Sequence, residues 1–191
     1  VQVMGVFVKI VILIFILTVI LLVFQFSVAG LVARRNPFTM LRTMLTAYVT
    51  ALGTQSSAAT IPVTLRQTIS LGIDPRIAGS VIPLCATVHL SGSMLKITAC
   101  ALAVMIMMNI PVDPAVFVGF IFLLAITMIA APGVPGGAIM AAIGVLQSVL
   151  GFDPEATGLM ISLYIAMDSF GTACNVTGDG AIAVIVDKMY A

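Results

Sequence analysis

The chain has 191 residues, of which 61% are hydrophobic and only 8% are charged, and its formal net charge is +1. This composition excludes a water-soluble globular domain and is typical of an integral membrane protein. The small net charge gives no electrostatic reason to expect a nucleic-acid partner or binding to an anionic membrane surface. We therefore expect a multi-pass protein whose partner is the lipid bilayer.

The first predicted element is a transmembrane span over about residues 6–33, which is apolar on all faces and ends at Arg34-Arg35-Asn36-Pro37. The apolar run is too long for the core of a signal peptide and no small-residue cleavage site follows it, so a span is the better interpretation. Because the chain starts at Val1 rather than methionine, we expect the natural start to lie elsewhere. Residues 1–36 are assigned to a transmembrane helix that ends in the cytoplasm.

Two later segments share a helix–tip–helix pattern. Residues 38–71 contain two short apolar stretches around the small-residue tip 53–60, with the second helix predicted to begin at Pro62. Residues 115–150 repeat this pattern around the proline- and glycine-rich tip 132–137. Each half is too short to cross a bilayer alone, and irregular backbone at membrane depth must be buried in protein or line a cavity. We predict two re-entrant hairpins.

Each predicted hairpin is followed by a long span with a polar interruption. Residues 74–108 carry His89-Leu90-Ser91-Gly92-Ser93 near their middle, and residues 154–189 carry the polar stretch from Asp168 to Asp179. A charged side chain in hydrocarbon costs roughly 2.5 to 3.5 kcal/mol even on the lower scale. We expect both spans to unwind at these stretches around a cation or polar substrate, although a helix end near the headgroups would also suit Asp179. Inverted-repeat secondary transporters have this order of elements, with the site between discontinuous helices.

The charges of the predicted loops test this topology. One set of loops holds five basic residues close to the spans, and the other set holds acidic residues with no lysine or arginine. The basic side has Arg34, Arg35, Arg66, Arg76 and Lys188, and the acidic side has Asp113, Asp153 and Glu155. The positive-inside rule makes the basic side cytoplasmic.

Three motifs occur in a specific order and spacing: residues 56–62 (SSAATIP), 133–137 (GVPGG) and 175–179 (NVTGD). In these motifs the sequence resembles the dicarboxylate/amino acid:cation symporters with the glutamate-transporter fold. The resemblance covers essentially the whole chain, as the C-terminal half of a full-length member without the N-terminal scaffold spans of the family. It implies an all-α membrane protein: two re-entrant hairpins and two broken transmembrane helices in an inverted repeat, preceded by one full span.

The resemblance also implies an organisation and a location. Residues 37–110 would hold the first hairpin and broken span, residues 111–191 the second pair, and residues 37–191 together one transport domain. A homotrimer in the cell (inner) membrane is implied as well.

The same resemblance implies a substrate site between the hairpin tips and the broken helices. Ser57 and the tip backbone would bind a substrate carboxylate, Asp168 would accept from an α-ammonium group, and the second tip would close as a gate. The implied substrate-binding residues are Ser56, Ser57, Ser93, Lys96, Val134, Gly136, Asp168, Thr172 and Asn175. Carboxylates suit helix N-termini.

A cation site is implied beside it. Asp179 and the carbonyl of Asn175 would coordinate sodium, since hard cations take carboxylate and carbonyl oxygens. Thr87 would border a second ion near the second tip. His89 and Ser91 complete the implied cation-binding set.

Two departures from the family pattern change these expectations. The family motif Asn-Met-Asp-Gly-Thr is replaced by His89-Leu90-Ser91-Gly92-Ser93, which removes a carboxylate and an amide from one sodium site. Histidine titrates near neutral pH, so proton coupling is one alternative, and a neutral His89 that is hydrogen-bonded within the packed break is the other.

The second departure is Gly171, where members that carry acidic substrates have an arginine for the side-chain carboxylate. Glycine alone predicts a neutral substrate. Lys96 lies three residues after Ser93 on a similar helix face. We hypothesise that Lys96 supplies the displaced positive charge, toward an acidic substrate or as a fixed counter-ion of Asp168, the alternative being a lysine that snorkels to water.

An intramembrane aspartyl protease is rejected, so we expect no enzyme. Asp168 and Asp179 are eleven residues apart, roughly 16 Å along a helix axis, whereas a proton-sharing dyad needs about 3 Å. We expect a symporter that couples sodium or proton entry to uptake of an amino acid or dicarboxylate, with Asp168 favouring an amino acid and no cofactor beyond the coupling ion. The alternative is a passive channel or an inactive fragment that lacks its scaffold.

Overall fold

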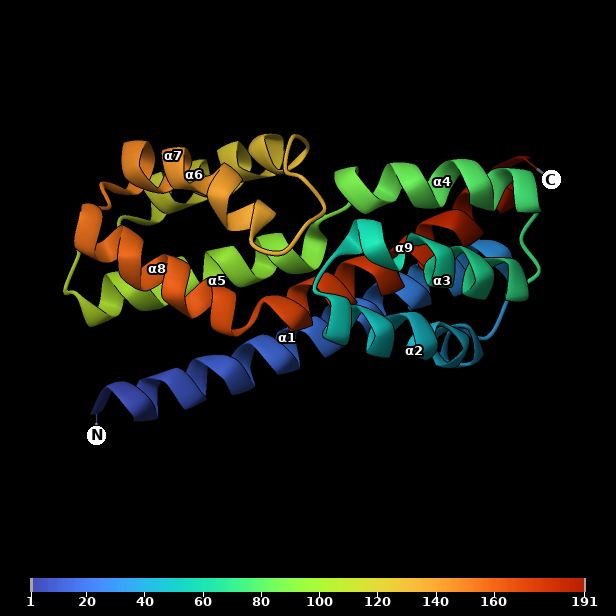
Figure 1. Cartoon of the computed structure of the whole chain (residues 1–191), viewed down its shortest axis with the longest axis horizontal. Coiled ribbons are helices and arrows are strands. Elements are labelled where there is room, and N and C mark those ends of the chain that lie inside the picture. The colour runs from blue at the N-terminus through green and yellow to red at the C-terminus, as the bar shows by residue number, and fades with distance from the viewer. Residues whose placement is uncertain (1, 191) are drawn as a thin grey trace.

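The structure is a computed structural model that describes residues 2–190, and this range folds into helices without a β-strand (Figure 1). The helices are α1 (Gln2–Ala33), α2 (Pro37–Thr54), α3 (Ser57–Ser70), α4 (Pro75–Val88), α5 (Ser91–Met107), α6 (Pro114–Met128), α7 (Gly137–Leu150), α8 (Pro154–Ala166) and α9 (Asp168–Tyr190). The prediction of an all-α protein with several apolar helices is confirmed. Among the described residues, three segments are long and apolar enough to cross a membrane: Val8–Ala33, Pro75–Met107 and Asp168–Tyr190.

Four helices begin at an Asn-Pro or Asp-Pro dipeptide. Asn36, Asp74, Asp113 and Asp153 each accept hydrogen bonds from backbone N–H groups of the first helical turn. The proline that follows each cap occupies the first helical position, where its missing N–H and fixed φ cost nothing. These dipeptides set the starts of α2, α4, α6 and α8.

The start of α3 differs from the prediction. Ser56 caps this helix, because its hydroxyl oxygen accepts from Ala59 N at 3.2 Å. The helix therefore begins at Ser57, and Pro62 lies inside it rather than at its start. The prediction that Pro62 begins the helix is wrong, because the serine cap satisfies the helix end one turn and a half earlier.

The helices surround two large hydrophobic cores. One core lies among α2, α4, α9 and the C-terminal half of α1 and contains Phe26, Met44 and Val184. The other lies among α5 to α8 and the N-terminal half of α1 and contains Phe120 and Met160. Figure 1 shows the two groups of helices at opposite ends of the molecule, with α1 running along both. The two helical hairpins (α2–α3 and α6–α7) therefore lie at opposite ends of the molecule.

The two long spans are broken between these cores. The first break lies at His89 and Leu90, between α4 and α5, as predicted. The second break lies at Met167, and α9 is continuous from Asp168 through Asn175. The prediction that the chain unwinds within residues 168–179 is wrong, because the polar side chains there bond to neighbouring helices while their own backbone stays helical.

The predicted basic loops and the predicted acidic loops lie at opposite ends of the molecule. Arg35 Nη1 donates to Leu71 O at 2.6 Å, and Asp74 N donates to Asp187 Oδ1 at 3.0 Å. These contacts bring the end of α1, the α3–α4 turn and the end of α9 together. Figure 1 shows the α5–α6 and α7–α8 loops, which carry Asp113 and Asp153, at the opposite end.

Candidate functional site

The tips of the two hairpins touch each other at the middle of the molecule. Gly133 O accepts from Ser56 Oγ at 2.8 Å and from Ala58 N at 3.1 Å. A Cβ atom on Gly133 would lie 2.8 Å from Ala86 O, closer than Cβ atoms approach other atoms. The second tip therefore depends on glycine to reach both the first tip and the end of α4.

We expect Gly133→Ala to disturb this contact between the tips. The new methyl group would meet a backbone carbonyl, which cannot rotate away, so the second tip must shift. We expect higher hydrogen exchange at Ala58 and protease sensitivity at residues 132–136. Gly144→Ala in α7 is the matched control, because a Cβ there has nothing within 4 Å. Equal protection in both variants would show that the tips do not need this close approach.

A small polar cavity lies beneath the tips. The residues that line it include Ser57, Ser93, Thr172, Asn175 and Asp168. Its volume is about 10 Å³, which is about the space that a single buried water needs. A cavity of this size is too small for an amino acid or a dicarboxylate.

The carboxylate of Asp168 is held on both oxygens. Lys96 Nζ donates to Oδ1 at 2.8 Å, and the backbone N–H of Gly136 in the second tip donates to Oδ2 at 2.8 Å. Lys96 Nζ also lies 3.4 Å from Met167 O and 3.4 Å from the centroid of the Tyr164 ring. Both side chains of the ion pair are buried, with 0% and 5% of their surface exposed. Lys96 is therefore the counter-ion of Asp168 and does not snorkel to water.

Gly171 gives Lys96 the room for this position. A Cβ on Gly171 would lie 3.2 Å from Lys96 Cε and 3.3 Å from Nζ. Residue 171 lies one turn after Asp168 on α9, so the ammonium group occupies the space that a side chain from residue 171 would need. Gly171 and Lys96 thus belong to one site.

Asn175 ties α9 to the start of α5. Its Oδ1 accepts from Gly92 N at 2.7 Å and from Ser93 N at 3.2 Å, and its Nδ2 donates to Ser93 Oγ at 2.8 Å. This carboxamide oxygen accepts hydrogen bonds from two N–H groups at the start of α5 that have no partner within the helix, as a capping side chain does. The Asn175 side chain is therefore committed to α5, while its predicted sodium contact is through the main-chain carbonyl.

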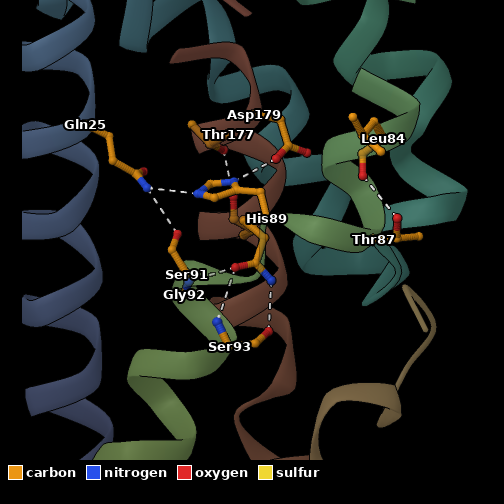
Figure 2. Close-up of polar contacts among 11 residues, drawn as sticks. Gln25, Leu84, Thr87, His89, Ser91, Gly92, Ser93, Thr177 and Asp179 are labelled. Carbon is orange, nitrogen blue, oxygen red and sulfur yellow. Dashed lines mark hydrogen bonds and ion pairs between the residues drawn. The ribbon is translucent and has the colours of Figure 1, made fainter. Parts of the chain in front are cut away.

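The predicted cation residues His89, Ser91 and Asp179 lie together beside the first break (Figure 2). His89 Nδ1 is 2.8 Å from Asp179 Oδ1, and the other ring nitrogen is 3.1 Å from Gln25 Nε2. Gln25 Nε2 also donates to Ser91 Oγ at 3.1 Å. These contacts fit a neutral imidazole with its proton on Nδ1, donating to the carboxylate and accepting from the amide.

The Thr87 hydroxyl and the Val134 side chain take no part in these contacts. The Thr87 hydroxyl donates to Leu84 O of its own helix at 3.0 Å, and Figure 2 shows it apart from the His89–Asp179 pair. Val134 borders the small cavity, but 51% of it is exposed. Neither side chain meets a polar group of the site.

Two residues of the site were not predicted from the sequence. Gln25 is an amide within the otherwise apolar first span, and that isolation was a usable signal because polar groups at membrane depth need partners. Tyr164 lies one helical turn before Asp168, a spacing that places an aromatic ring near the carboxylate.

Comparison with known proteins identifies the family. The profile of the sodium:dicarboxylate symporter family matches residues 1–189. The chain belongs to this family. Among the relatives, mouse excitatory amino acid transporter 2 is 33% identical over 156 residues, covering 81% of this chain and 27% of the relative. Mouse excitatory amino acid transporter 4 is 35% identical over 164 residues, covering 83% and 28%, respectively.

A bacterial relative has a similar level of identity. The serine/threonine transporter SstT of Acinetobacter baumannii is 35% identical over 165 residues, covering 83% of this chain and 40% of the relative. The chain thus spans well under half of the length of these relatives. All three are transporters by name, which agrees with the rejection of an enzyme, and family membership with three candidate spans makes this a multi-pass membrane protein.

Proposed function

We propose that the protein is a secondary active symporter, in which sodium or proton entry drives uptake of a small carboxylate solute, an amino acid or a dicarboxylate. The observation that carries this proposal is the polar cavity that two touching hairpin tips close between two broken helices. A channel would need a continuous passage, whereas this cavity has room for only about one water.

Opening would begin at the second tip. Its release requires loss of the bonds from Gly133 O to the first tip and of the Gly136 N–H bond to Asp168. A substrate carboxylate would then face the N-terminal end of α3 at Ser57, where helix N–H groups favour an anion. The helices of each hairpin have at most 18 residues, about 27 Å, so we propose that both hairpins are re-entrant.

The coupling ion would act at Asp179. This carboxylate is buried beside the α4–α5 break and meets His89. A sodium ion would use the Asp179 carboxylate and the Asn175 carbonyl, and a proton would use the His89–Asp179 pair. By family resemblance we further propose scaffold spans, a homotrimer and the cell (inner) membrane. The names of the relatives point to amino acids, for which the resemblance implies an ammonium contact with Asp168.

Uptake into proteoliposomes tests the proposal. The full-length protein is reconstituted, and accumulation of labelled amino acids and dicarboxylates is followed under an imposed sodium gradient or an imposed proton gradient. We expect accumulation above equilibrium under one of these gradients and only slow equilibration without it. Solute-independent conductance without accumulation would contradict the symporter and support a channel.

A further inference from the structure

The position that a substrate ammonium group would take on Asp168 is already taken by the chain itself. Lys96 Nζ lies 2.8 Å from Asp168 Oδ1 within the closed structure. Taking up the symporter proposed above, we infer that Lys96 is a resident ammonium group, and that the site therefore selects small carboxylates without an ammonium group over amino acids. Lys96 is then a specificity-determining residue.

The lysine has no room to withdraw from Asp168. Its ammonium group lies against the face of Tyr164 on one side and beside Gly171 on the other, and the side chain is fully buried. Lys96 Nζ also donates to Met167 O, and the backbone N–H of Gly136 donates to the other carboxylate oxygen, Oδ2. The pair therefore presents a neutral, fixed unit to the cavity.

A second ammonium group at Asp168 would be repelled. Two cations bonded to one carboxylate lie within about 4–6 Å of each other. At that distance the two positive charges repel each other, and the repulsion is strongest where water is excluded. An amino acid would therefore have to displace Lys96 or bind beside it.

A carboxylate without an ammonium group avoids this conflict. Ser57, Ser93 and Thr172 are among the residues that line the cavity, and their hydroxyls carry no charge and can donate to the oxygens of such a carboxylate. The Lys96 charge cancels the repulsion that Asp168 would otherwise exert on the incoming anion. The Lys96–Asp168 bond stays intact throughout.

Three probes that differ at one carbon test this inference. Succinate, L-malate and L-aspartate share both carboxylates and carry hydrogen, hydroxyl and ammonium, respectively, at the α-carbon. Binding to the purified full-length protein is measured calorimetrically and by thermal stabilisation. We expect succinate and L-malate to bind at least about 10-fold more tightly than L-aspartate, a ratio within the range of one close like-charge contact.

Variants of Lys96 separate charge from shape. Lys96→Met removes the charge at similar length, and we expect the order to reverse, with L-aspartate about 10-fold tighter than succinate because Asp168 is then free for its ammonium. Lys96→Arg keeps the cation and should keep the preference for succinate. If Lys96→Met does not fold, Lys96→Met with Asp168→Asn removes both charges, and the ratio should fall to within about 3-fold of unity.

The outcomes also separate this inference from the proposed function. Preferential binding of L-aspartate by the wild type, an unchanged ratio in Lys96→Met, or no binding of any probe overturns the role of Lys96. Gradient-driven uptake of L-aspartate in preference to succinate leaves the symporter in place and removes this inference. The predicted binding ratios without gradient-driven uptake would support the inference and contradict the symporter.

Discussion

Lys96→Met is expected to lower the free energy of unfolding by about 3–5 kcal/mol, the usual cost of removing one partner from a buried ion pair. The loss is large because the Asp168 carboxylate would be left in a buried position without its ammonium partner. Methionine has similar length and fills the space above Tyr164, so a cavity contributes little. Denaturant-induced unfolding in detergent, monitored through the helix content, measures the change.

A double-mutant cycle attributes this loss to the pair. Asp168→Asn should also destabilise, since it leaves the lysine unpaired, and the double variant should be more stable than the sum of the single changes predicts by about 0.5–3 kcal/mol. Lys9→Met removes a positive charge from an exposed position on α1 and should change stability by less than about 0.5 kcal/mol. Additive effects of the two single changes would mean that Lys96 and Asp168 do not interact in the folded protein.

The order of the helices was largely predictable because it depends on local signals. The Asn-Pro and Asp-Pro dipeptides mark helix starts through capping, and the tip at residues 132–137 breaks a helix through its prolines and glycines. The course of α9 was not predictable in this way. Whether Asn175 unwinds its helix or reaches out of an intact one depends on a partner, and that partner is the start of α5, more than eighty residues earlier.

The site was only partly predictable for the same reason. Lys96 stood out because a lysine in the middle of an apolar segment needs a counter-charge, and Gly171 indicated where space for it existed. Which charge Lys96 would meet depended on the packing of α5 against α9, and the sequence left both alternatives open. Gln25 is a single amide outside any polar cluster, and its partners His89 and Ser91 lie more than sixty residues later, so its contacts depend on the packing of α1.

Asp179→Asn is expected to abolish the dependence of substrate binding on the coupling ion. In the proposed symporter the ion and the substrate share a coupling free energy, which typically changes affinity by about 5- to 150-fold. Asparagine keeps the size and an acceptor for His89 but removes the negative charge that would attract either sodium or a proton. Substrate affinity, measured with and without sodium and at two pH values, should therefore become the same under all conditions.

Asp187→Asn, two turns further along α9, is the matched control. Its carboxylate accepts from Asp74 N at the end of the molecule, an acceptor role that asparagine retains, so its ion dependence should equal that of the wild type. The His89–Asp179 pair lies at the break before α5. One turn earlier in α9, Asn175 holds the first residues of α5. An ion at Asp179 can therefore act on Ser93, which lines the cavity. If Asp179→Asn kept the ion dependence of the wild type, this physical connection between the ion and the substrate would have to be abandoned, and the coupling charge sought elsewhere in the fold.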